Sequence, residues 1–214
     1  MSPIPLMIDL NGRRTVVVGG GAVAEKRVNV LCEAGAFITI ISPSVTRTLE
    51  EKVTSNKRIE WIRKEFDEAY LKDAYTVVIA TNDEKVNEQA LRSASHVPLI
   101  NYPPDANKGN FTIPGYLTRG KLTISISTGG ASPMLASRIK KRLANEYDDD
   151  YGQYVDFLYV CRQQLKQSSL PKEEKQTLLK HLLHDSYKNR DQQTLFLKEL
   201  EKLKEGGTVF ERIN

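Results

Sequence analysis

The chain has 214 residues, 40% of them hydrophobic and 27% charged, which is ordinary for a folded protein of one large or two small domains. It has no apolar run as long as a membrane span, no secretory signal pattern and only two distant cysteines, Cys32 and Cys161, so we expect a cytoplasmic protein without membrane contact. The positive charge in excess, which gives the net charge of +4, lies in residues 113–147. This excess suits the binding of an acidic small molecule and is small for a protein that binds nucleic acid.

A glycine turn follows the first expected strand, 13–18, and precedes the first expected helix, 22–34. A strand, a glycine turn and a helix in this order form the phosphate cradle of dinucleotide-binding folds. Gly19 permits the turn, Gly21 lets the backbone approach a pyrophosphate, and Ala24 lets helix and strand pack closely. The alternative is a tight turn without a ligand.

Strands and helices continue to alternate up to residue 112. We expect strands at 37–41, 59–62, 76–80 and 98–101, and helices or helical turns at 45–53, 67–72 and 83–94, the last capped by Asn82. This alternation predicts an α/β fold with a Rossmann-type parallel sheet over residues 1–112.

The pattern changes after Pro103. Strands at 111–113 and 122–126, joined by a turn at 118–121, predict a hairpin, and Ser132 and Pro133 begin a helix with an apolar stripe. This small α+β segment spans 113–147. The remainder, 148–214, reads as a helical domain with helices near 151–168, 172–184 and 191–204, closed by glycines at 206–207, and a strand signal at 208–210.

The acid expected to hold the cofactor ribose in a plain NAD fold is missing. It should stand about 20 residues after the glycines, where this chain has Ser42, Pro43 and Ser44. The serines are weak ribose ligands, and Arg47 is a cation that could meet a 2′-phosphate. Local chemistry therefore leaves NAD and NADP open.

Polar residues end the fourth and fifth expected strands, on the edge where ligands bind in such sheets. They are Thr81, Asn82 and Asn101, and Asp105 follows in a proline-containing loop. A carboxylate there could act as a general base, or the aspartate could simply form a turn.

Hydroxyl and basic residues of the middle segment are candidates for binding carboxylates. The stretch 127–132 could bind an anion through backbone N–H groups or could only cap the helix. Among the cations, Arg119 is a better ligand candidate than Lys140 and Lys141, which we expect on a solvated helix face. His181 and His184 share a helix face in this reading, but two histidines do not make a metal site, and none is predicted.

These motifs together resemble the precorrin-2 dehydrogenase module of sirohaem biosynthesis. The matching segments are 17–27, 33–36, 41–43, 78–83 with Val86 and Asn87, Ile100 and Asn101, Phe111 with Pro114, Arg119 and Gly120, and 126–136. They cover residues 5 to about 147 in the right order and spacing, whereas the helical tail matches only in length and character.

The resemblance implies an NAD-dependent oxidation of precorrin-2, an acidic tetrapyrrole, to sirohydrochlorin by a homodimer. Residues 113–147 would be the dimerisation region, and the tail would help to cover the tetrapyrrole. The implied cofactor contacts are Gly19, Gly21, Ala22, Val23, Pro43, Ser44, Thr81 and Asn82, and the substrate candidates are Asn101, Arg119, Ser125, Ser127, Thr128 and Arg138.

The chain departs from the family pattern at the catalytic acid. Many members have aspartate where this chain has Pro104, and the resemblance transfers the general-base role to the neighbouring Asp105. Two alternatives remain open beside the dehydrogenase: a bifunctional enzyme that also inserts Fe²⁺ into sirohydrochlorin, and a non-enzymatic nucleotide-sensing module. A dehydrogenase alone could pass its product to a separate chelatase.

Overall fold

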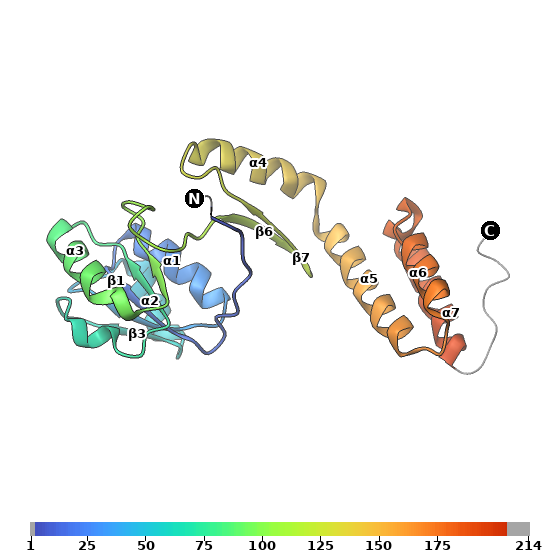
Figure 1. Cartoon of the computed structure of the whole chain (residues 1–214), viewed down its shortest axis with the longest axis horizontal. Helices are drawn as coiled ribbons and strands as arrows, with labels where there is room; N and C mark the ends of the chain where they lie inside the picture. The colour runs from blue at the N-terminus through green and yellow to red at the C-terminus, as the bar shows by residue number, and fades with distance from the viewer. Residues whose placement is uncertain (1–2, 205–214) are drawn as a thin grey trace. The chain divides into compact units, whose positions relative to one another are not determined.

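A computed structural model describes residues 3–204, which fall into two compact units divided between Ile113 and Pro114 (Figure 1). The second unit contains both the predicted middle segment and the helical tail. The glycines at 206–207 and the strand signal at 208–210 lie outside the described residues.

The first unit is built on a five-stranded parallel sheet, as the sequence predicts. Its strands are β1 (Arg14–Val18), β2 (Phe37–Ile41), β3 (Ile59–Ile62), β4 (Thr76–Ile79) and β5 (Leu99–Asn101), in the order β3-β2-β1-β4-β5. Val18 lies beside Ile41 on one side and Ile79 on the other, so the central strands end at a common edge. The strand order reverses beside β1, and open α/β sheets bind their ligands at such a point.

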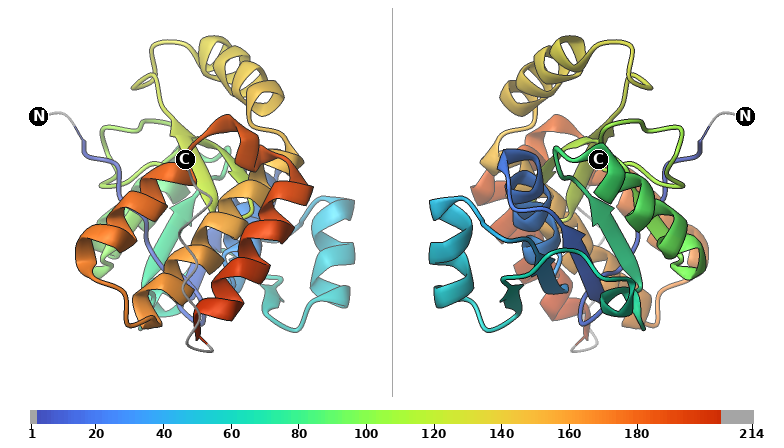
Figure 2. Two further views of the ribbon diagram at one scale, coloured as in Figure 1. Left: turned by 90° about the vertical axis from the view of Figure 1, so that its right-hand side faces the viewer. Right: turned by 90° about the vertical axis from the view of Figure 1, so that its left-hand side faces the viewer.

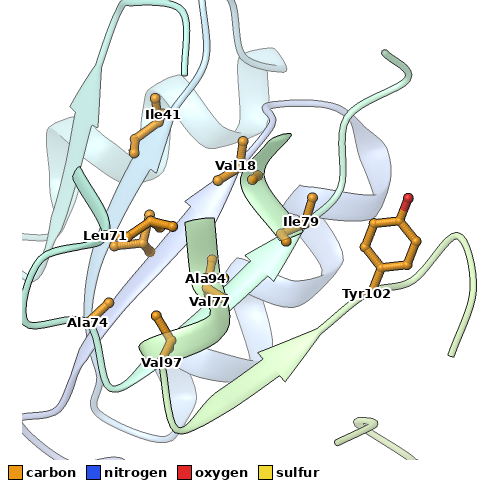
Figure 3. Close-up of a cluster of buried hydrophobic side chains, with 11 residues drawn as sticks. Val18, Ile41, Leu71, Ala74, Val77, Ile79, Ala94, Val97 and Tyr102 are labelled. Carbon is orange, nitrogen blue, oxygen red and sulfur yellow. The ribbon is translucent and has the colours of Figure 1, made fainter. Parts of the chain in front are cut away.

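Successive residues of the strands point to opposite faces of the sheet, and each face packs into its own hydrophobic core. Val16 and Val18 join a cluster with Ile79 and residues of α3 (Glu84–Ser93) and of the short 3₁₀ helices η1 (Glu68–Leu71) and η2 (Ala94–His96) (Figure 3). Val17 points to the opposite cluster, which contains residues of α1 (Ala22–Glu33) and α2 (Arg47–Ser55). Both faces are covered, which explains why the central strands β1, β2 and β4 carry runs of apolar residues instead of alternating.

Side-chain caps determine where two helices begin. Thr46 accepts a hydrogen bond from the Leu49 amide, so α2 begins at Arg47, two residues later than predicted. The prediction that Asn82 caps α3 is wrong: the Asp83 carboxylate accepts from the amides of Lys85 and Val86. A carboxylate is the stronger acceptor at the positive end of a helix.

The second unit opens with the predicted hairpin, but its first strand is misplaced in the prediction. Strand β6 (Gly115–Arg119) pairs antiparallel with β7 (Leu122–Ile126), whereas residues 111–113 form no strand. The Phe111 amide is instead directed at the Ile100 carbonyl of β5. Helix α4 (Pro133–Glu146) follows, and Ser132 caps it by accepting from the Leu135 amide, as predicted.

Three helices form the tail of the second unit, where α5 (Asp149–Gln167) packs against both α6 (Lys172–His181) and α7 (Arg190–Lys204) (Figure 2). Their common core includes Phe157, Cys161 and Phe196. The prediction that His181 and His184 share a helix face is wrong. Helix α6 ends at His181, and His184 instead caps the 3₁₀ helix η3 (Asp185–Lys188).

Burial makes the two cysteines differ in reactivity. It raises the pKa of the fully buried Cys161 thiol from its ordinary value of 9.0 to about 12, whereas Cys32 is only half-buried. At pH 8 we expect a thiol reagent to label Cys32 quickly and Cys161 only after unfolding. Mass spectrometry of labelled wild type and Cys32→Ser checks this, and rapid labelling of folded Cys32→Ser would contradict it.

The same shift sets the pH dependence of the Cys161 contribution to stability. Above about pH 9 the unfolded chain loses a thiol proton that the folded chain keeps, so the contribution is present below pH 9 and is lost as pH rises toward 12. We expect the free energy of unfolding of the wild type, relative to Cys161→Ala, to fall over this range in denaturant titrations.

Candidate active site

A cleft of about 710 Å³ opens at the edge of the sheet where β1, β2 and β4 end. Its lining includes all eight predicted cofactor residues: Gly19, Gly21, Ala22, Val23, Pro43, Ser44, Thr81 and Asn82. Sequence reasoning missed several further lining residues, among them Thr46, Glu65, Phe66 and Asp83. Glu65 and Phe66 follow β3, and only the strand order shows that this loop reaches the cleft.

The glycine turn has the geometry of a phosphate cradle. Gly19 has a φ of +116°, and a Cβ there would overlap the carbonyl group of Ala80, the residue that follows β4. Gly20 is equally confined, since a Cβ would collide with Ser44 and Val45. Gly21 faces open space, and it begins α1 without any side-chain cap. The first amides of α1 are thus free to meet an anion, which is the fit that a dinucleotide pyrophosphate requires.

A second loop is tied to the glycine turn by side-chain and backbone hydrogen bonds. The Thr46 amide donates to the Gly20 carbonyl at 3.0 Å, and the Thr46 hydroxyl donates to the Glu25 carboxylate at 2.5 Å. This charge-assisted bond links the loop after β2 to α1. The two walls of the cleft are therefore held together, which the sequence did not reveal.

Asn87 holds the turn that begins at Thr81. Its side-chain oxygen accepts from the Thr81 hydroxyl at 2.8 Å and from the Thr81 amide at 3.3 Å, and its amide donates to the Thr81 carbonyl at 3.0 Å. The Asn87 side chain is buried on α3, so these bonds are shielded from water. Asn87 belongs to the matched family segments, but no role was predicted for it.

Replacing Asn87 by alanine should loosen this wall of the cleft. The amide, hydroxyl and carbonyl groups of Thr81 lose their Asn87 partner, so we expect the free energy of unfolding to fall by about 1–3 kcal/mol and NADH affinity to fall severalfold. Thermal melting and NADH fluorescence titration measure the two effects. Gln89→Ala, an exposed change on the same helix, is the control and should alter neither. Unchanged NADH affinity in Asn87→Ala would contradict the prediction.

The charged side chains that line the cleft are all acidic. Among the described residues that line it there is no Lys, Arg or His, and the two carboxylates are Glu65 and Asp83. Asp83 is committed to capping α3. Arg47, the cation considered for a 2′-phosphate, is not in the lining: its side chain is 91% exposed and its Nε lies 2.9 Å from Glu51 Oε1.

The loop that carries Asp105 is anchored at its base. The Asn110 side chain accepts from the Ile100 amide at 2.7 Å and donates to the Pro98 carbonyl at 2.9 Å, and the Asn101 amide donates to the Phe111 carbonyl at 3.1 Å. These bonds occupy the outer edge of β5 and hold both ends of the loop.

Asp105 itself is half-buried near the tip of the loop. Its Oδ1 accepts from the backbone and side-chain amides of Asn107, so the turn-forming interpretation holds. Oδ2 has no hydrogen bond within the described residues and remains available for proton transfer. Asn101 is 2% exposed, and its Oδ1 has no partner among the described residues. Substrate contact by Asn101 stays a prediction.

The predicted substrate residues of the second unit are described within that unit alone. Arg119 Nε lies 3.1 Å from Asp149 Oδ1, so this cation already has an acidic partner. Thr128 exchanges hydrogen bonds with Ser132, and the Ser127 hydroxyl accepts from the Gly129 amide, which is the capping interpretation of this loop. Ser125 on β7 and Arg138 on α4 are exposed. Substrate contact by these residues also stays a prediction.

Residues 3–204 contain neither a clustered metal site nor a membrane-spanning helix. No group of three or more His, Cys, Asp or Glu side chains there is arranged to hold a metal ion. None of the helices in that range combines the length and apolar character that crossing a membrane requires.

Comparisons with known proteins agree with a dinucleotide-binding fold for the first unit. A family model described as putative NAD(P)-binding matches residues 6–115, so the first unit is a nicotinamide-dinucleotide-binding domain of the Rossmann class. Models described as the sirohaem biosynthesis protein central domain and the SirC C-terminal domain match residues 119–146 and 151–196. The chain belongs to the precorrin-2 dehydrogenase family.

Individual relatives and a solved structure support this assignment to the family. The precorrin-2 dehydrogenase of Priestia megaterium is 37% identical over 93% of this chain and 98% of its own length. That of Bacillus subtilis is 32% identical over 74% of this chain and 98% of its own length. The sirohaem synthase of Mannheimia succiniciproducens is 34% identical, but only 35% of it is covered. A solved structure titled SirC, precorrin-2 dehydrogenase matches with a TM-score of 0.80 and 35% identity, over 94% of this chain and all of that one.

Proposed function

We propose that this protein oxidises precorrin-2 to sirohydrochlorin with NAD⁺ in sirohaem biosynthesis. The observation that carries the proposal is the cleft beside β1, whose glycine turn and uncapped α1 suit a dinucleotide, in a chain that matches dehydrogenases over 98% of their length. The absence of a cation from the described lining favours NAD over its 2′-phosphorylated form.

The reaction removes a hydride and a proton from the substrate. When bound, the nicotinamide supplies the hydride acceptor. Asp105 is the general base: its free Oδ2 takes the proton, while Oδ1 stays bonded to Asn107 and keeps the carboxylate in place. Asn101 and Asn110 hold the loop on β5, so the base is presented from a rigid sheet edge.

The second unit binds the acidic tetrapyrrole and joins two copies of the chain in this proposal. Precorrin-2 has eight carboxylates, and residues 113–147 carry the positive excess of the chain. Helix α4 has no fully buried residue, and Met134 and Leu135 at its start are exposed, which favours it as the homodimer contact. The protein acts in the cytoplasm and passes sirohydrochlorin to a separate chelatase.

A turnover assay tests the function. Purified protein is supplied with precorrin-2 and NAD⁺, and the absorbance of sirohydrochlorin and NADH is followed in time. Equal formation of both products is expected, and no turnover would contradict the proposal. A second arm adds Fe²⁺ or Co²⁺ to sirohydrochlorin, with a protein-free control. We expect no acceleration of metal insertion, because the relatives covered over nearly their whole length are named as dehydrogenases alone.

A further inference from the structure

The loop after β3 brings a carboxylate to the part of the cleft that lacks its usual acid. β2 and β3 end side by side, with Ile41 in register with Ile62, and the Ser42 amide donates to the Ile62 carbonyl at 3.3 Å. The chain then turns, and Glu65, three residues past the end of β3, lines the same cleft as Ser42, Pro43 and Ser44. An acid from β3's loop thus stands near the position where dinucleotide folds place an acid at the end of β2.

The surroundings of Glu65 hold this part of the cleft in place. Trp61 Nε1 donates to the Ser42 carbonyl at 2.9 Å, and Arg63 Nε donates to the Pro43 carbonyl at 3.3 Å. Phe66, next to Glu65, packs against the core cluster that contains Val18. The backbone on both sides of Glu65 is therefore attached to the sheet, although its carboxylate is exposed.

The Glu65 carboxylate is free for a ligand. It makes no hydrogen bond or ion pair within residues 3–204, whereas Asp83, the other acid in the lining, caps α3. Arg63, the cation that follows β3, lies outside the lining, and its guanidinium carbon is 5.4 Å from the centre of the Trp61 ring. A ribose 2′-hydroxyl can donate to a free carboxylate, whereas a 2′-phosphate is repelled by it.

We infer that Glu65 is the residue that selects NAD over NADP in this protein. The inference rests on the proposed cofactor and adds the residue that discriminates. Glu65 accepts a hydrogen bond from the adenosine ribose and keeps a 2′-phosphate out by charge repulsion. It replaces, from a different strand, the acid that the sequence lacks after β2.

The test is binding of NADH and NADPH to the purified full chain, followed by nucleotide fluorescence without any tetrapyrrole. The wild type should bind NADH more tightly. In Glu65→Gln, the ratio of the NADPH Kd to the NADH Kd should fall by about tenfold or more, chiefly through tighter NADPH binding. Glu60→Gln is the matched control, since it removes the same charge from an exposed β3 position outside the cleft lining, and its ratio should equal that of the wild type.

Each other result overturns the inference. An unchanged ratio in Glu65→Gln, or an equal fall in Glu60→Gln, removes Glu65 as the discriminating residue. A wild type that binds both nucleotides equally, or NADPH more tightly, does the same. If Arg63→Gln weakens NADPH binding in the wild-type background more than NADH binding, Arg63 and not Glu65 governs the 2′-position. A protein that shows the expected ratios but does not oxidise precorrin-2 would leave Glu65 in its role and refute the proposed reaction.

Discussion

We expect the substitution Asp105→Asn to lower the rate of precorrin-2 oxidation by about 10²–10⁴-fold, the usual contribution of a positioned general base. Asparagine keeps a side-chain oxygen that can accept from Asn107, so the turn survives while the basic oxygen is lost. Asp105→Ala removes both the base and the turn and should be at least as inactive. Steady-state rates with saturating NAD⁺ measure the loss.

NADH binding is the control for the Asp105 variants. Asp105 does not line the nucleotide cleft, so both variants should bind NADH as the wild type does. A variant that loses activity together with NADH binding would show damage to the fold of the first unit. Full activity in Asp105→Asn would refute the catalytic assignment and leave Asp105 as a turn residue.

Alanine substitutions at Gly19 and Gly21 should separate folding from cofactor binding. Gly19→Ala places a Cβ against the Ala80 carbonyl group at a φ of +116°, so we expect the free energy of unfolding to fall by about 1–3 kcal/mol and NADH binding to be lost. Gly21→Ala adds a methyl group that meets no protein atom within 4 Å, at a φ of −82° that alanine readily adopts. Its stability should equal that of the wild type.

The informative result is the behaviour of Gly21→Ala toward the nucleotide. If Gly21 makes room for a pyrophosphate, the methyl group occupies that room, and NADH affinity should fall by tenfold or more although the protein stays folded. Thermal melting and NADH titration of both variants provide the comparison. A Gly21→Ala protein with wild-type NADH affinity would place the pyrophosphate elsewhere in the cleft.

Local patterns predicted the elements of the first unit well because their apolar runs and caps are short-range signals. The glycine turn and the strand ends that line the cleft follow directly from the order strand, turn, helix. The hairpin strand was misplaced by a few residues because Phe111 and Asn110 bond to β5, a contact that no local pattern reveals. His184 was misplaced for a local reason: its ring caps the 3₁₀ helix η3 where the periodicity predicted that the preceding helix continues.

Contacts between segments distant in sequence were not predictable. Glu65 reaches the cleft only because β3 and β2 are neighbours, and Thr46 reaches Glu25 only because the pairing of β1 and β2 brings the loop after β2 to the glycine turn. Asn87 could have been found, since it lies six residues after Thr81 on a predicted helix. Its position alone, however, does not distinguish a clamp from an ordinary buried amide.

The Asn110 side chain also changes what the exposed edge of β5 offers to another chain. By bonding to Ile100 and Pro98 it occupies backbone groups that would otherwise be open to another strand, so the loop that carries Asp105 also protects this edge against edge-to-edge association. The attachment points lie at 98–101 and 110–111, and the bonds between Asp105 and Asn107 shape the tip between them.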